Sequence, residues 1–195
     1  ADFDSLYQAF LANLDAVLEA HVRERNRTES QAWRYNPCPA HSATMDDCLA
    51  RARDMFDGGI RYNAGSISLA GIGTLIDSLF ATRQVVFDER QCTLEELRGR
   101  LDANFEHTEP FRRLLAGCVA KFGQEDAVMR AFSSRVFADL ARVSTGRPNA
   151  RGGRYEASLF SFRTFAHLGA GTGATPDGRR AGEHLSPGMG PSLLA

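Results

Sequence analysis

The chain has 195 residues, of which 43% are hydrophobic and 24% are charged. This balance is typical of a folded globular protein and argues against a disordered chain. The formal net charge is −1, so there is no overall field to attract nucleic acid or an anionic membrane, and we expect neither as a partner.

The first 143 residues carry mainly helical patterns. Apolar residues at helical spacing predict a helix over residues 3–25. A second helix is expected over residues 42–55, where the glycines at 58–59 would end it. Residues 60–63 are a short candidate strand.

The next stretch is strongly apolar. Residues 66–87 predict one largely buried helix. Thr93 and Glu96 have the spacing of a capping box, so a helix is expected to begin there. Further helices are predicted from Glu109 onward and over residues 125–143.

The character of the sequence changes in residues 144–195. Residues 144–154 are rich in Gly, Arg, Asn and Pro and predict a loop, and residues 155–163 alternate as a strand does. After Ala166 the chain is rich in Gly and Pro, which predicts a succession of turns.

The four cysteines show no C-x-x-C unit, which argues against a structural zinc site, and we assign no metal ligand. The sequence shows no secretory segment, so we expect free thiols in a reducing, cytoplasmic compartment. Cys38 and His41 could pair as nucleophile and base, although we favour a packed thiol beside a surface histidine.

The glycines at 173 and 178 have the spacing of a phosphate-binding loop. Arg179 and Arg180, however, replace the Lys and the Ser or Thr that such a loop needs, so nucleotide binding is disfavoured. We expect Asp177 to accept backbone amides and Gly178 to supply a positive φ angle, with Arg179 helping to fix the turn.

Three blocks of residues follow one another along the chain. They are SATMDDCL and GGIRYN at 42–49 and 58–63, GIG and DSL at 71–73 and 77–79, and GATPDGRRAGE and LSP at 173–183 and 185–187. In this order and at these spacings, they resemble the C-terminal half of the pyruvate formate-lyase domain of glycyl radical enzymes.

The resemblance implies a fold and a chemistry. The fold is a helix-rich α/β barrel of ten strands, in which helices wrap two five-stranded half-sheets. A glycyl radical abstracts hydrogen from a Cys thiol, and the thiyl radical attacks the substrate in a barrel closed to oxygen and solvent. A partner activase that uses S-adenosylmethionine and an iron–sulfur cluster installs the radical. The parent enzyme is expected to be a homodimer of anaerobic metabolism.

The family's catalytic residues are not expected in this chain. The Gly-Cys loop would precede residue 1, and the Arg-Val-x-Gly-Tyr radical motif would follow residue 195. Cys118 imitates the Gly-Cys loop, but it lies in a helical pattern and downstream of the 58–63 block, which indicates a structural thiol. No catalytic residue and no bound cofactor is assigned to the chain.

The resemblance implies that this chain forms part of the barrel wall. Candidate substrate-binding residues are Tyr62, Asn63, Leu185, Ser186 and Pro187, with turn closure as the alternative role. The substrate itself stays open among pyruvate, glycerol, diols, choline and aromatic acids.

We therefore predict that residues 1–195 are one internal segment of a glycyl radical enzyme of formate acetyltransferase, lyase or dehydratase type. The segment alone would be inactive and would need the rest of the barrel, the activating enzyme and a small organic substrate. The alternative is a stand-alone, non-catalytic paralogue that binds or scaffolds. A nucleic-acid module is disfavoured because the net charge is near zero.

Overall fold

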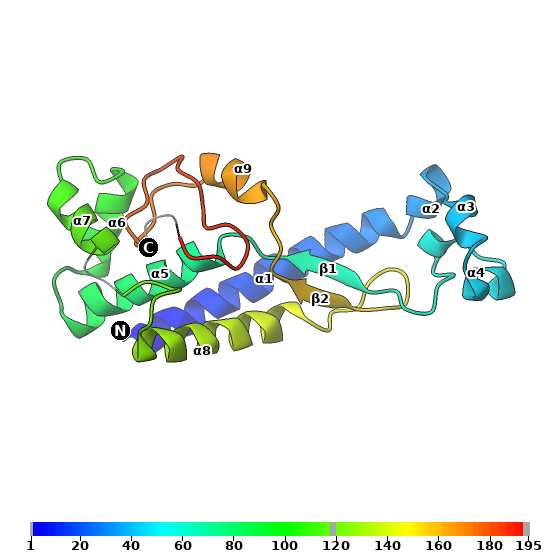
Figure 1. The fold of residues 1–195 in the computed structure, drawn as a ribbon, viewed down its shortest axis with the longest axis horizontal. Helices are drawn as coiled ribbons and strands as arrows, with labels where there is room; N and C mark the ends of the chain where they lie inside the picture. The colour runs from blue at the N-terminus through cyan, green and yellow to red at the C-terminus, as the bar shows by residue number, and fades with distance from the viewer. Residues whose placement is uncertain (1, 118–119, 193–195) are drawn as a thin grey trace. The chain divides into compact units, whose positions relative to one another are not determined.

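The structure is a computed structural model that describes residues 2–117 and 120–192 (Figure 1). Its contacts divide the chain into two compact units. Unit 1 holds the residues up to Gln8, Ser68–Asp139 and the residues from Leu159 onward, and unit 2 holds Ala9–Ile67 and Leu140–Ser158. The helical first part and the Gly- and Pro-rich last part of the sequence therefore both contribute to each unit.

Unit 2 is built on most of α1 (Phe3–Glu29) and on the end of α8 (Ala127–Ser144). The hydroxyl of Tyr155 donates to Asn26 Oδ1 at 3.0 Å and so ties the strand that begins at Tyr155 to α1. Both long helices were predicted at nearly these positions. The buried apolar residues of this unit are Leu11, Leu18, Val22, Cys48, Ile67, Leu140, Val143 and Tyr155.

Between α1 and the first strand the chain forms short helices instead of the single helix expected over 42–55. The carboxylate of Asp54 accepts hydrogen bonds from the amide of Cys38 at 2.8 Å and from the hydroxyl of Ser42 at 3.0 Å. These bonds hold a compact turn that competes with a continuous helix. The short elements are α2 (Ala32–Tyr35), α3 (Pro39–Ser42), α4 (Asp46–Arg51) and a 3-10 turn at Met55–Asp57.

The first strand lies later than the sequence indicated. Residues 60–63 are irregular, with a bend at 60–61, and Asn63 Nδ2 donates to the carbonyl oxygen of Ile60 at 2.8 Å. Strand β1 is Gly65–Ser68. A Cβ on Gly65 would lie 2.5 Å from the ring of Tyr155, so this approach requires glycine.

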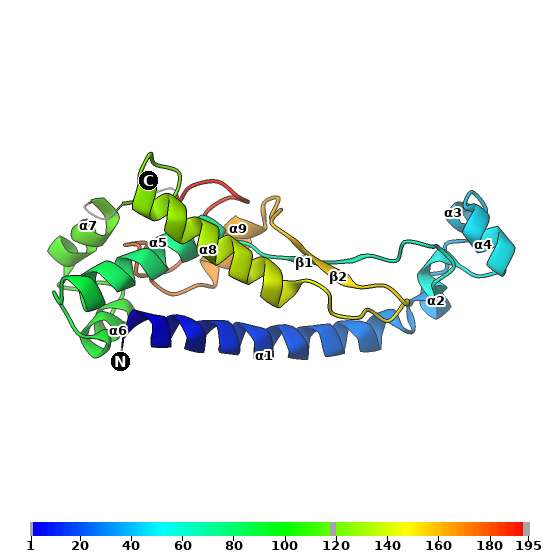
Figure 2. The same ribbon diagram turned by 90° about the horizontal axis from the view of Figure 1, so that it is seen from below.

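Strand β1 pairs in parallel with β2 (Tyr155–Ser158), as Figure 2 shows. The strand expected over 155–163 stops at Ser158. Shortly afterwards Phe162 adopts a φ of +44°, a left-handed backbone conformation that an extended strand does not accommodate. The described part of the chain is thus a helix-rich α/β structure with two parallel strands.

Unit 1 is centred on α5 (Ile72–Thr82), a helix in which nearly every residue is buried. A π-helical turn, Arg83–Asp88, follows it directly. The apolar run 66–87, expected to be one helix, is therefore divided among β1, α5 and this turn. Hydrophobicity alone does not separate a buried strand from a buried helix.

Unit 1 also holds most of α8 and three further helices: α6 (Leu94–Asp102), α7 (Glu109–Gly117) and α9 (Thr164–Ala170). The predicted capping box is confirmed. Thr93 Oγ1 accepts from the amide of Glu96 at 3.2 Å, and Glu96 Oε2 accepts from the amide of Thr93 at 2.7 Å. Helix α9 extends past Ala166, where the glycine content had indicated only turns.

The core of unit 1 is partly aromatic. The ring centroid of Phe132 lies 5.9 Å from that of Phe3 and 5.4 Å from that of Phe80. The hydroxyl of Tyr7 donates to Asp139 at 3.0 Å. Aromatic contacts of this kind join the start of α1, α5 and α8 within the unit.

Candidate functional site

The predicted residue Ser186 lies at the start of α5 and is fully buried. Its hydroxyl accepts a hydrogen bond from the amide of Thr74 at 3.0 Å, and its own amide donates to Thr74 Oγ1 at 2.9 Å. Gly71, the N-cap residue of α5, has no side chain to satisfy the free amides of the first turn. Ser186 therefore supplies from 112 residues away the cap that α5 lacks.

Two glycines allow this approach. A Cβ on Gly73 would lie 2.6 Å from the carbonyl oxygen of Gly190, and a Cβ on Gly71 would lie 3.1 Å from the Leu185 side chain. Gly71 also has a φ of +74°. The GIG block and the LSP block, which carry part of the family resemblance, thus meet in space. We refer to residues 172–192 as the C-terminal segment (Figure 1).

A buried charge cluster lies further along α5, formed by Asp77, Lys121 and Asp177. Their exposed fractions are 0%, 2% and 0%. Asp77 Oδ1 accepts from the amide of Phe122 at 2.7 Å, and Lys121 Nζ donates to the carbonyl oxygens of Leu115 and Asp177 at 2.8 and 2.9 Å. Lys121 thereby joins the end of α7 to the C-terminal segment.

Burial sets the protonation of this cluster. It raises the pKa of Asp77 to about 6, an effect that the Phe122 amide and the nearby Lys121 ammonium only partly offset. Burial also lowers the pKa of Lys121, against the attraction of Asp77 and Asp177. The structure thus holds two carboxyl groups beside one amine, away from water.

Asp177 and Arg179 fix the turn at residues 175–179, as predicted. Asp177 Oδ1 accepts from the Thr175 hydroxyl at 2.5 Å and from the Arg179 amide at 3.3 Å, and Gly178 has a φ of +95°. The Arg179 guanidinium is buried, which lowers its pKa, and it donates to main-chain carbonyls of the same segment, including that of Glu183 at 2.7 Å. Arg179 is thus occupied in holding the loop together.

A second set of charges ties the segment to α7. Glu109 accepts from Arg112 at 2.7 Å, from Arg113 at 3.1 Å and from Arg180 at 2.6 Å. The Arg112 guanidinium first, and the other two after it, lower the pKa of Glu109 to about 2. Gly178 packs against α7, since a Cβ there would lie 3.0 Å from Ala116.

The other predicted substrate-binding residues have different surroundings. Leu185 and Pro187 are half-buried on either side of Ser186 in unit 1. Tyr62 and Asn63 belong to unit 2. The Tyr62 side chain is 83% exposed, whereas Asn63 is buried, and its carbonyl oxygen accepts from Asn149 Nδ2. Within unit 1 the structure brings Leu185, Ser186 and Pro187 together at α5.

The thiols are consistent with structural roles. Cys38, Cys48 and Cys92 are free, and Cys38 Sγ lies 3.3 Å from Nδ1 of the exposed His41. Cys38 is half-buried, and the preference for a structural thiol over a nucleophile and base stays a prediction. Cys118 lies outside the described residues, so its expected structural role stays a prediction.

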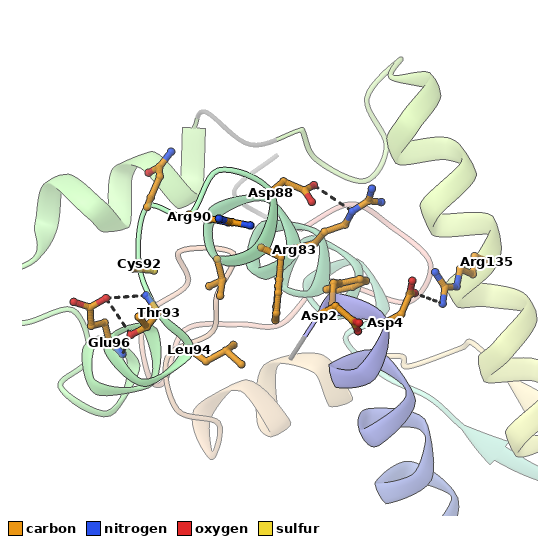
Figure 3. Close-up of a pocket in the computed structure, with 14 residues that line it drawn as sticks. Asp2, Asp4, Arg83, Asp88, Arg90, Cys92, Thr93, Leu94, Glu96 and Arg135 are labelled. Carbon is orange, nitrogen blue, oxygen red and sulfur yellow. Dashed lines mark hydrogen bonds and ion pairs between the residues drawn. The ribbon is translucent and has the colours of Figure 1, made fainter.

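Unit 1 also contains a cavity of about 910 Å³ that the sequence did not indicate (Figure 3). Four of its charged side chains form two ion pairs. Arg135 donates to Asp4 at 2.8 Å, and Arg83 lies 3.3 Å from Asp88. Burial raises the pKa of the Cys92 thiol on its wall, so that thiol stays protonated at neutral pH. The cavity therefore holds no activated nucleophile on its described walls.

Two features of the described residues bear on cofactors and membranes. In that part of the chain, no three or more His, Cys, Asp or Glu side chains gather in a way that would hold a metal ion. No described helix combines the length and the apolar character needed to cross a bilayer.

Sequence reasoning missed the buried charge cluster and the role of Ser186 as a cap. One signal was present: Lys121 is the single lysine of a chain that otherwise uses Arg for its cations. Nothing in the local sequence showed that it is buried, because its partners are distant in sequence.

Comparison with known proteins gives the family. The family profile described as "Pyruvate formate lyase-like" matches residues 1–169. The chain is 31% identical over 189 residues to the trans-4-hydroxy-L-proline dehydratase of Clostridioides difficile, covering 97% of this chain and 24% of that protein. It is 29% identical over 157 residues to the isethionate sulfite-lyase of Desulfovibrio desulfuricans, covering 78% of this chain and 18% of that protein.

Solved structures agree. The substrate-bound crystal structure of the C. difficile hydroxyproline dehydratase matches with a TM-score of 0.93 over 98% of this chain and 24% of its own. A glycyl radical enzyme from Archaeoglobus fulgidus matches at 25% identity with a TM-score of 0.88, over 95% of this chain and 24% of its own. The chain thus spans about a quarter of the length of these relatives. It belongs to the pyruvate formate lyase-like family of glycyl radical enzymes.

Proposed function

We propose that this chain is the part of a glycyl radical dehydratase or lyase that builds one side of the barrel and supports the wall of the substrate pocket. The observation that carries the proposal is the match over 98% of the chain, at a TM-score of 0.93, to one quarter of the C. difficile dehydratase. The radical-bearing glycine and the thiyl cysteine would come from the other three quarters. Alone, the chain would be inactive.

The strand arrangement supports a place in the ten-stranded barrel. β1 and β2 are parallel, and helices α5 and α9 follow them. A parallel pair in which helices follow the strands is the kind of unit from which a helix-wrapped half-sheet is built. On this proposal residues 1–195 act as a single segment of the parent domain, and the remaining strands lie in the rest of the protein.

The pocket residues divide into two roles on this proposal. Because the hydroxyl of Ser186 accepts a hydrogen bond from the amide of Thr74, Ser186 would hold the turn in place. Leu185 and Pro187 would present apolar surface to the substrate. Tyr62, with its exposed phenol, would supply a polar contact, and the buried Asn63 would set its position. Each set is proposed within its own unit, Leu185, Ser186 and Pro187 in unit 1 and Tyr62 and Asn63 in unit 2.

The reaction class follows the relatives. The comparisons above name a dehydratase and a sulfite-lyase, so we propose elimination of water or a similar group from a small organic substrate in preference to formate acetyltransfer. The parent enzyme would be a cytoplasmic homodimer. An activase that uses S-adenosylmethionine would install its glycyl radical.

A chimera tests the proposal. This chain replaces the matched quarter of the C. difficile dehydratase, and the product is incubated anaerobically with that enzyme's activase and S-adenosylmethionine. We expect the glycyl doublet in the electron paramagnetic resonance spectrum of the chimera and no doublet from the chain alone. Turnover of trans-4-hydroxy-L-proline then measures how far this quarter determines the substrate.

Two outcomes contradict the proposal. A folded chimera without a doublet would show that the chain does not complete the barrel, and a doublet from the chain alone would show that it carries its own radical site. The intact mass of the native gene product tests the alternative that the chain is a stand-alone protein. A mass near 21.4 kDa would favour a non-catalytic paralogue.

A further inference from the structure

The buried charge cluster contains two carboxyl groups but only one amine. Asp77 and Asp177 are fully buried carboxyl groups, and the buried amine of Lys121, which donates to the main-chain carbonyl oxygen of Asp177, is attracted by both. In the described residues, Oδ2 of Asp177 lacks a hydrogen-bond partner, and Oδ2 of Asp77 has none of good geometry, although the Ser192 hydroxyl lies near the Asp77 carboxyl group and favours its charged form. A buried carboxylate oxygen without a partner is costly, and protonation of one carboxyl group is the cheapest way to remove the excess charge.

The cluster also lies where three parts of unit 1 are joined by hydrogen bonds. Asp77 stands on α5 and holds the amide of Phe122, while Lys121, the preceding residue, holds the carbonyl oxygens of Leu115 and Asp177. Gly123 follows closely and packs on the C-terminal segment, since a Cβ there would lie 3.1 Å from Pro191. Any change in the charge of Asp77 therefore acts where α5, the end of α7 and the C-terminal segment are joined.

We propose that Asp77 is a proton-controlled anchor, whose protonation state sets how tightly the C-terminal segment is held on α5. With the proton bound, the cluster holds one ammonium and one carboxylate. When the proton leaves, two carboxylates share one ammonium in a site closed to water, and the attachment weakens. This inference concerns the chain itself and does not depend on the proposed function.

The direction of the pH effect follows from linkage. Burial raises the pKa of Asp77 from its ordinary value of 3.8 to about 6. A group with a raised pKa in the folded state contributes stability that is fully present below pH 3.8 and is lost as pH rises through about 6. Besides burial, the groups that act on Asp77 are the Phe122 amide, the Lys121 ammonium and the Ser192 hydroxyl of the C-terminal segment, which favour the charged form, and Asp177, which opposes it.

The test is hydrogen exchange of the full-length protein that carries this chain, followed by mass spectrometry of peptides that cover Phe122 and the C-terminal segment. After correction for intrinsic rates, we expect protection to fall about tenfold between about pH 5 and about pH 7.5, the factor that the raised pKa gives by linkage. The Asp77→Asn variant should lose this fall, because Asn keeps the acceptor for Phe122 but does not titrate.

A matched control is Asp126→Asn. Asp126 also accepts one main-chain amide, that of Met129 at 2.6 Å, but it lies outside the cluster, so this variant should keep the tenfold fall. The inference is overturned if wild-type protection does not change with pH, or if Asp77→Asn shows the same change as wild type.

A second variant keeps the test valid if Asp77→Asn does not fold. Asp177→Asn retains the Oδ1 acceptor for Thr175 and Arg179 but removes a charge that adds to the main effect, burial, in raising the pKa of Asp77. The midpoint of the pH dependence should therefore move toward acid. An unchanged midpoint would show that the two carboxyl groups are not coupled and would also overturn the inference.

Discussion

At the scale of single residues, the clearest case is the hydroxyl of Ser186, which caps a helix from a distant part of the chain. Ser186→Ala would leave the buried amide of Thr74 without an acceptor, at a cost of about 1–3 kcal/mol. Urea unfolding followed by circular dichroism measures this loss.

A serine on the surface of α8 gives the control for Ser186. Ser134 donates to the carbonyl oxygen of Arg130 at 2.9 Å in an exposed position, so Ser134→Ala should change stability by less than about 0.5 kcal/mol. Equal losses for the two variants would mean that the hydroxyl of Ser186 does not act as a cap.

Glu109 gives a prediction for how stability changes at acid pH. Its pKa is lowered to about 2, so the stability it contributes is present above about pH 4.5 and is lost as pH falls toward 2. Glu109→Gln should therefore flatten the decline of the melting temperature in that window. Glu125→Gln, at an exposed glutamate before α8, should leave the decline as it is. This window lies below the one assigned to Asp77, so the two effects are separable.

At the scale of elements, two helical glycines make opposite predictions for the same substitution. Gly73→Ala places a Cβ 2.6 Å from the carbonyl oxygen of Gly190 and should destabilise the protein by about 1–3 kcal/mol. Gly99→Ala, inside α6 with no atom within 4 Å of its Cβ, should stabilise it by about 0.5–1 kcal/mol. The denaturant midpoints of the two variants, compared with wild type, test both predictions. A Gly73→Ala protein as stable as wild type would contradict the close contact between α5 and the C-terminal segment.

Elements with local causes were predictable from the sequence. The capping box at Thr93 and the start of α7 at Glu109 depend on residues within one turn, and both predictions were confirmed. The strand placed at 60–63 was wrong because β1 is defined by its pairing with β2, about 90 residues away. The helix expected over 42–55 was divided by Asp54, whose contacts with Cys38 and Ser42 cross a turn.

At the scale of the whole molecule, the division into two units predicts separable unfolding signals. Trp33, the only tryptophan, lies in unit 2, whereas the C-terminal segment belongs to unit 1. Deletion of residues 172–195 should uncover α5 and abolish the protection of its amides in hydrogen exchange, while the unfolding transition seen by Trp33 fluorescence stays at the same denaturant concentration. A large shift of the Trp33 transition would show that the C-terminal segment also stabilises unit 2.

The family could be identified from the sequence because three blocks kept their order and spacing, although none showed its role. The structure explains the spacing of the second and third blocks, because residues 71–79 and 173–187 meet at α5 and around Lys121. The candidate site was therefore only partly predictable. Asp177 and Gly178 act within their own turn, but Asp77 and Lys121 acquire their properties from burial, which composition does not report.

The burial of Lys121 has a practical consequence. It is the only lysine, and its side-chain amine is held inside by two carbonyl oxygens, so an acylating reagent meets no lysine amine on the surface of the folded chain. A molecule can therefore be acylated at Lys121 only after the structure around this side chain has opened. The rate of acylation thus reports the frequency of such opening. For this chain by itself, coupling to a support through lysine would select molecules in which the surroundings of Lys121 had opened.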